Sequence, residues 1–135
     1  MVEYISKRLK LPTGRETILA EALRFCYDLS ETDATILFKL LEDGEYTVDD
    51  LTRALGLTKA TINRGLSKLM ELGFVNRTRE RASRIGRPRF KYYVDDPEKV
   101  INKLISDFEE CAQSLREVLE GIRKEVLSRR KSRRE

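Results

Sequence analysis

The chain has 135 residues, of which 40% are hydrophobic and 37% are charged, which is the size of one globular domain with room for an appended element. It has no histidine and only two cysteines, which lie far apart in the sequence, so we expect no metal site, no cofactor and no enzymatic activity. No stretch has the features of a targeting signal or a membrane span, and we therefore expect a cytoplasmic protein without a membrane partner.

The net charge of +4 is distributed unevenly along the chain. Residues 1–56 carry 7 Lys/Arg against 11 Asp/Glu, residues 57–94 carry 10 against 2, and residues 95–135 carry 10 against 10. A solvated surface run is the usual explanation of clustered charge, but it fits poorly here because acidic residues are nearly absent from the middle segment. Such a segment would steer a polyanion toward one face of the protein.

The first predicted element is a helix that follows a turn at residues 12–14, which read Pro-Thr-Gly. Apolar residues recur at helical spacing from Ile18 to about Leu29. We therefore interpret residues 1–29 as an N-terminal helical segment and expect it to support a dimer.

Two further helices begin with the same signature. Ser30 with Asp33 resembles a capping box and opens a helix that ends at Gly44. Thr47 with Asp50 repeats the signature and opens a shorter helix.

The next predicted helix covers residues 58–72, with Thr58 as its N-cap and Gly73 as the residue that ends it. Its core face is formed by residues at helical spacing, namely Ile62, Leu66 and Leu69. Because a tight turn joins it to the preceding helix and its outer face is polar and basic, the pair has the pattern of a helix-turn-helix.

Two β-like runs follow, at residues 74–78 and 89–94, and an arginine-rich loop with Gly86 and Pro88 separates them. We predict a basic hairpin, or wing, over residues 77–91. The fold class is therefore mainly α with a small β-hairpin (α+β), and the winged helix-turn-helix domain covers residues 30–94.

The last predicted helix covers residues 95–128, with Pro97 at the favoured first position. About 30 residues form a rod of roughly 45 Å, which is too long for a small domain to cover, so we expect the same helix of a second copy to pair with it in a homodimer. The alternative is that the N-terminal helix packs along it within one chain. The predicted interface residues are Ile101, Leu104, Ile105, Phe108, Cys111, Ala112, Leu115, Val118, Leu119 and Ile122.

Residues 129–135 are predicted to be a basic tail. The tail is either a disordered arm that adds phosphate affinity or a fraying helix end.

Residues 58–77, TKATINRGLSKLMELGFVNR, resemble the recognition helix and first wing strand of MarR-like winged-helix regulators. Residues 86–100, GRPRFKYYVDDPEKV, resemble the archaeal TrmB-like group, in which a Gly-Arg-Pro wing leads to a tyrosine strand and a proline-led helix. The resemblance implies a transcriptional regulator that binds double-stranded DNA. Because the sequence stops after the long helix, where larger TrmB members have a sugar-binding domain, we expect a stand-alone DNA-binding unit whose effector is unknown.

In this interpretation the recognition helix enters the major groove, where Arg64 would bind guanine and Asn63 would bind adenine. Lys59 and Lys68 are better interpreted as phosphate contacts, and two arginines near the hairpin tip as minor-groove or phosphate contacts. Plain solvation is the alternative for each. The predicted DNA-binding residues are Thr58, Lys59, Ala60, Thr61, Asn63, Arg64, Ser67, Lys68, Arg84, Arg87, Arg89 and Lys91.

Three functions remain in competition. The first is a sequence-specific homodimeric regulator that reads half-sites about one DNA turn apart. The second is an architectural, chromatin-like protein with little sequence preference, and the third is a winged helix that binds an acidic protein. The first is favoured because the recognition helix offers asparagine and threonine beside arginine, and the basic wing argues against the third.

Overall fold

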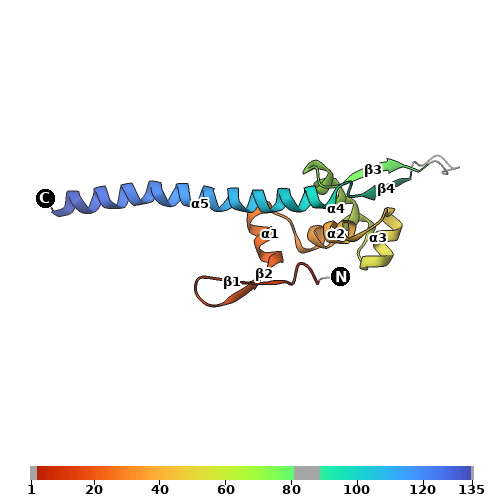
Figure 1. Ribbon diagram of the computed structural model, residues 1–135, viewed down its shortest axis with the longest axis horizontal. Helices are drawn as coiled ribbons and strands as arrows, with labels where there is room; N and C mark the ends of the chain where they lie inside the picture. The colour runs from red at the N-terminus through yellow and green to blue at the C-terminus, as the bar shows by residue number, and fades with distance from the viewer. Residues whose placement is uncertain (1–2, 81–88, 135) are drawn as a thin grey trace. The chain divides into compact units, whose positions relative to one another are not determined.

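The computed structural model describes residues 3–80 and 89–134 (Figure 1). The chain divides into two compact units, Met1–Val100 and Ile101–Glu135. The elements, in chain order, are β1 (Arg8–Lys10), β2 (Glu16–Ile18), α1 (Leu19–Tyr27), α2 (Glu31–Glu42), α3 (Val48–Leu55), α4 (Lys59–Glu71), β3 (Asn76–Arg79), β4 (Phe90–Tyr93) and α5 (Pro97–Arg134). The architecture is mostly helical with two short hairpins, β1–β2 and β3–β4, and it confirms the predicted α+β fold class with a small hairpin after α4.

Side-chain caps begin the three helices around the helix-turn-helix, as the sequence predicts. The Ser30 hydroxyl accepts a hydrogen bond from the backbone N–H of Asp33 (3.1 Å), whose carboxylate accepts one from the Ser30 N–H (3.1 Å). Thr47 and Asp50 form the same reciprocal pair at 3.1 and 2.9 Å, and Thr58 caps α4. Because each cap satisfies backbone donors that the helix leaves unpaired, these local interactions set where each helix begins.

The core of the first unit forms around α4, which packs against α2 and α3. The predicted apolar stripe of α4 is confirmed, since Ile62, Leu66 and Leu69 are almost completely buried. At the end of α4, Gly73 adopts a positive φ of 81°, and the next residue, Phe74, is buried. The chain therefore leaves the helix through a left-handed glycine turn and enters the hairpin directly from the core.

The α4–α2 contact is unusually close at Gly65. A Cβ atom at this position would lie 2.6 Å from Cδ1 of Ile36 and 3.1 Å from Oδ1 of Asp33. Ile36 is fully buried, and Asp33 is committed to the cap of α2. A side chain larger than that of glycine would therefore require a shift of Ile36 or of the helices themselves.

The predicted wing hairpin is present as antiparallel strands β3 and β4, in a register that pairs Asn76 with Tyr93 and Arg79 with Phe90. Tyr46, in the loop before α3, exchanges two backbone hydrogen bonds with Tyr92, at 3.0 and 2.8 Å. The wing is therefore joined through backbone hydrogen bonds to the segment that begins the helix-turn-helix.

The N-terminal segment differs from the prediction. A helical segment is predicted over residues 1–29, but the helix covers only α1, and β1 and β2 form an antiparallel hairpin before it. The predicted turn at residues 12–14 is the turn of this hairpin, which the backbone bond from Leu11 to Arg15 closes at 2.8 Å. Strands of three residues are too short to show the alternation that identifies a strand in a sequence.

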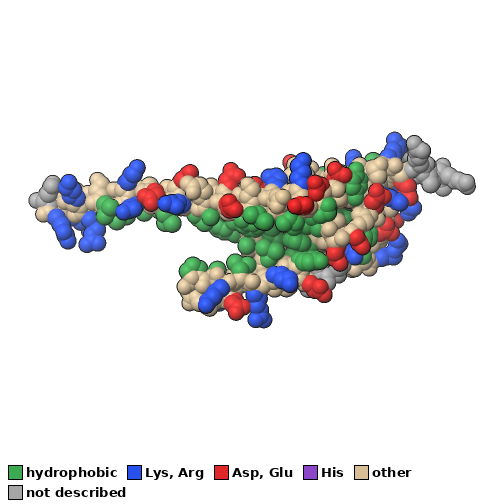
Figure 2. All heavy atoms as spheres, in the orientation of Figure 1, with side chains coloured by type: hydrophobic (Ala, Val, Ile, Leu, Met, Phe, Trp, Pro, Cys, Tyr) green, Lys and Arg blue, Asp and Glu red, His purple; other side chains and the backbone are tan. Residues whose placement is uncertain are grey.

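Helix α5 also differs from the prediction. A basic tail is predicted over residues 129–135, yet α5 continues without interruption to Arg134. Arg129 pairs with Glu125 one turn earlier at 3.2 Å, and the cations of the last turn interact favourably with the helix dipole. The helix has 38 residues, or about 57 Å, and Figure 2 shows hydrophobic side chains gathered along one side of it.

Within residues 3–80 and 89–134, none of the helices combines the length and hydropathy that a bilayer span requires.

Replacing Gly65 with alanine is expected to lower the free energy of unfolding by about 1–3 kcal/mol, because the added methyl group overpacks the α4–α2 contact. Urea denaturation measures the change. Gly121→Ala in α5 is the matched control, since no heavy atom of the described residues outside that helix lies within 4 Å of its Cβ position. The control should gain up to about 1 kcal/mol from the higher helix propensity of alanine, and equal gains in both variants would contradict the packing argument.

Candidate nucleic-acid interface

The side of α4 opposite its apolar stripe is open to solvent. Of the eight α4 residues and cap residues that the sequence predicts to bind DNA, Thr61 and Lys68 are half-buried. The remaining six are exposed, namely Thr58, Lys59, Ala60, Asn63, Arg64 and Ser67. Polar and cationic groups on this face can therefore approach the edges of bases or phosphates without a change in the packing of the helix.

Hydrogen bonds connect the exposed side chains of the first turns of α4. The Thr58 hydroxyl donates to the Thr61 hydroxyl at 2.9 Å, and the Arg64 guanidinium donates to the same Thr61 oxygen at 3.4 Å. The Thr61 hydroxyl oxygen therefore accepts hydrogen bonds from two side chains of the predicted DNA-binding set. The guanidinium keeps further donors for a ligand.

Lys68 occupies a different position from the rest of the predicted set. Its ammonium group donates to the backbone carbonyl of Asp28 and forms ion pairs with the carboxylates of Asp28 (3.8 Å) and Asp33 (3.9 Å). Lys68 thereby links α4 to the end of α1 and the start of α2. These contacts give Lys68 a structural role within the chain, and its assignment as a phosphate contact stays a prediction.

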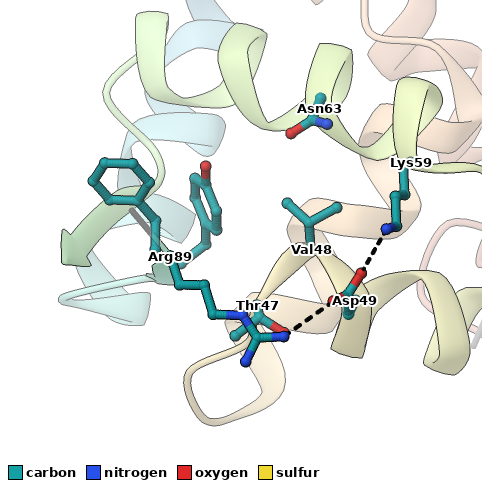
Figure 3. A pocket seen from close by; sticks show the side chains of 8 residues that line it. Thr47, Val48, Asp49, Lys59, Asn63 and Arg89 are labelled. Atoms are coloured by element: carbon teal, nitrogen blue, oxygen red, sulfur yellow. Dashed lines mark hydrogen bonds and ion pairs between the residues drawn. The ribbon is translucent and has the colours of Figure 1, made fainter. Parts of the chain in front are cut away.

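Three elements meet at a pocket beside the recognition helix (Figure 3). Along one side of it the Asp49 carboxylate, on α3, pairs with the Lys59 ammonium and with the Arg89 guanidinium, each at 3.3 Å. The lining residues are Thr47, Val48, Asp49, Lys59, Asn63, Arg89, Phe90 and Tyr92. The structure therefore brings together Lys59, Asn63 and Arg89 from the predicted DNA-binding set.

Asp49 was not predicted as a member of this site. In the sequence it stands in the first turn of a helix, where an acidic residue is explained by the helix dipole. Its neighbour Asp50 has a purely local role: the backbone N–H of Thr47 holds the pKa of the Asp50 carboxyl below its usual value, with further help from the Thr47 hydroxyl and from Arg53. The sequence identifies the capping role of Asp50, but only the folded chain shows that Asp49 contacts Lys59 and Arg89.

The wing strands carry cations on their exposed positions. Arg77 and Arg79 of β3 are exposed, and the Arg77 guanidinium lies 4.0 Å from the ring centroid of Phe90. Arg89 is exposed and Lys91 is half-buried. The predicted tip residues Arg84 and Arg87 lie outside the described residues.

The apolar residues predicted for a dimer interface lie along α5 in the second unit. Exposed members are Ile101, Ile105, Ala112, Leu115, Val118, Leu119 and Ile122. Phe108 and Cys111 are half-buried, and Leu104 is buried. Val126 and Leu127 extend the exposed apolar surface toward the carboxyl end.

Comparisons with known proteins agree with this arrangement. The chain matches the family model described as sugar-specific transcriptional regulator TrmB over residues 23–98. It is similar to an uncharacterized protein of Methanocaldococcus jannaschii, with 28% identity over 113 residues, which are 80% of this chain and 87% of that protein.

Two solved structures have a similar fold. A possible transcriptional regulator from Methanosarcina mazei Go1 superposes with a TM-score of 0.70 at 19% identity, covering 89% of this chain and 97% of that one. A MarR transcriptional regulator from the same organism superposes with a TM-score of 0.50 at 22% identity, covering 76% and 68%. These similarities confirm the winged-helix fold.

Replacing Lys68 with methionine, which keeps an unbranched apolar side chain but removes the ammonium group, is expected to lower the free energy of unfolding by about 1 kcal/mol. The reason is that Asp33, which is largely buried, loses its cation and Asp28 loses a donor to its carbonyl. Lys59→Met is the matched control, because Lys59 forms an exposed ion pair with Asp49. This variant should change the free energy of unfolding by less than about 0.5 kcal/mol. Urea denaturation of both variants measures the difference, and a Lys68→Met protein as stable as the wild type would contradict the structural role.

Proposed function

Because this chain belongs to the TrmB family of transcriptional regulators, we propose that it binds double-stranded DNA as a homodimer and regulates transcription by sequence-specific recognition. The family also confirms the prediction that the protein is a regulator and not an enzyme. The matched residues 23–98 include the helices of the helix-turn-helix and the strands of the wing, and the proposal extends to DNA and to no sugar. Such a protein would act where the chromosome lies, which fits the cytoplasmic location expected from the sequence.

The exposed polar face of α4 is the observation that carries this proposal. In the proposed complex α4 lies in the major groove, where Asn63 and Arg64 read base edges. Thr58 and the backbone N–H groups at the start of α4 would hold a phosphate. Both helices of the helix-turn-helix are held by one buried core, so the reading side chains are presented by a rigid element.

The wing would supply affinity more than sequence choice. Its strands carry exposed arginines, and arginine suits both phosphate contact and a narrow minor groove. In this proposal the wing lies along the DNA backbone beside the groove that α4 enters. Arg84 and Arg87 are assigned to the minor groove or the phosphates, and Arg89 and Lys91 to the phosphates.

The apolar face of α5 would join two copies. Seven of the ten predicted interface residues are exposed, and a contiguous apolar stripe of this length is unusual on a monomer. Heptad spacing of Ile101, Phe108, Leu115 and Ile122 suits pairing of two helices. A symmetric dimer would present two recognition helices to a palindromic site.

The architectural alternative differs from this proposal in one measurable quantity, the preference for a selected site. We expect sites selected from random DNA to bind at least about 1,000-fold more tightly than random sequence. Asn63→Ala and Arg64→Ala should each reduce that preference by about 1–3 kcal/mol at one position of the site. Competition binding at fixed salt measures both effects, and a preference near one would support the architectural alternative.

Variants of the wing provide the contrast for the same assay. Arg84→Ala combined with Arg87→Ala should weaken binding to all sequences alike and make the salt slope less steep by about 0.9 for each lost phosphate contact. An unchanged slope would remove the tip of the wing from the proposed interface.

Disruption of the α5 face is expected to dissociate the dimer. Leu119→Lys places a charge within the apolar stripe, and sedimentation equilibrium should then give the 15.7 kDa of one chain, whereas the wild type should give twice that mass. Gln113→Lys is the matched control, because it introduces the same side chain on the polar side of α5 and should leave the dimer intact. A wild-type protein that sediments as a monomer at micromolar concentration would contradict the dimer.

A further inference from the structure

Asp49 ties the recognition helix to the wing. Its two carboxylate oxygens divide between two cations: one lies 3.3 Å from the Lys59 ammonium at the start of α4, and the other lies 3.3 Å from the Arg89 guanidinium next to β4. Both dashed contacts of Figure 3 meet at this one side chain. The three side chains together carry a net charge of +1, although two of them belong to the predicted DNA-contact set.

Folding stability does not explain this arrangement. The Lys59 side chain is 71% exposed, that of Arg89 is 60% exposed and that of Asp49 is 37% exposed. Ion pairs between side chains as exposed as these contribute little to the folded state. The same exposure allows the phosphates of DNA to compete with Asp49 for the two cations.

We propose that Asp49 is an electrostatic restraint on DNA binding, and the proposal rests on the DNA-binding function inferred above. A phosphate that approaches Lys59 or Arg89 meets a carboxylate already placed between them, so one of the two cations remains compensated. Binding to random DNA depends almost entirely on such phosphate contacts. Asp49 therefore weakens attachment to DNA of any sequence, while the base contacts of Asn63 and Arg64 are left untouched.

The helix dipole is the competing explanation, because Asp49 stands in the first turn of α3. Glu31 offers a matched comparison. It is an exposed acidic residue in the first turn of α2, and it belongs to neither the DNA-contact set nor the predicted dimer interface. Glu31→Gln removes the same charge from the same kind of helix position.

The test is to measure the affinity of the full-length chain for a duplex of random sequence over a series of salt concentrations. Asp49→Asn keeps the shape of the side chain and releases both cations, so binding should tighten by about tenfold at low salt. The slope of log K against log[salt] should become more negative by about 0.9, the value for one additional phosphate neutralised. Glu31→Gln and the charge-conserving Asp49→Glu should both retain the wild-type slope.

The outcomes separate this inference from the function on which it rests. If the wild type binds and Asp49→Asn has the same slope or binds more weakly, Asp49 serves only to orient the cations or the helix, and the restraint is overturned. The restraint is also overturned if Glu31→Gln steepens the slope equally, since the effect would then be one of general charge. If the wild type shows no salt-dependent binding to any duplex, the proposed function fails and the restraint fails with it.

Discussion

The candidate interface depends on the close contact between α4 and α2 at Gly65. With Ile36 only 2.6 Å from the position of a Cβ atom, the face of α4 that contains Gly65 packs closely against α2. This orientation turns Asn63 and Arg64 outward, and it turns Lys68 toward the ends of α1 and α2. The glycine and the buried stripe of Ile62, Leu66 and Leu69 thus define the same inward face of α4.

Local signals in the sequence predict the helix-turn-helix well. Caps such as Thr47 with Asp50 depend on residues three positions apart, so their partners are visible in the sequence itself. The same holds for the apolar stripe of α4 and for the glycine turn at Gly73, each of which reports the burial or backbone conformation of its own segment. The position of the wing also follows from the sequence, because apolar and polar residues alternate along the strand that contains Tyr92.

Contacts between distant segments could not be predicted in this way. Asp49 and Arg89 are forty positions apart, as are Asp28 and Lys68, and nothing in either segment identifies its partner. Charge patterns show where cations are concentrated but not which of them are already paired. Among the described residues of α4, Lys59 and Lys68 are both paired with acids, whereas Arg64 contacts a hydroxyl.

The wing strands are joined to the segment around the start of α3 by two kinds of contact. Tyr46 joins Tyr92 through two backbone hydrogen bonds, and Asp49 joins Arg89 across the same pocket. The wing and α4 are therefore positioned by one framework, so affinity from wing arginines and sequence choice from α4 would be gained in a single docking step. The ion pairs of Asp49 are exposed, so phosphates could compete with this carboxylate for Lys59 and Arg89. The Tyr46–Tyr92 backbone bonds do not depend on these charges, so the position of the wing would be kept.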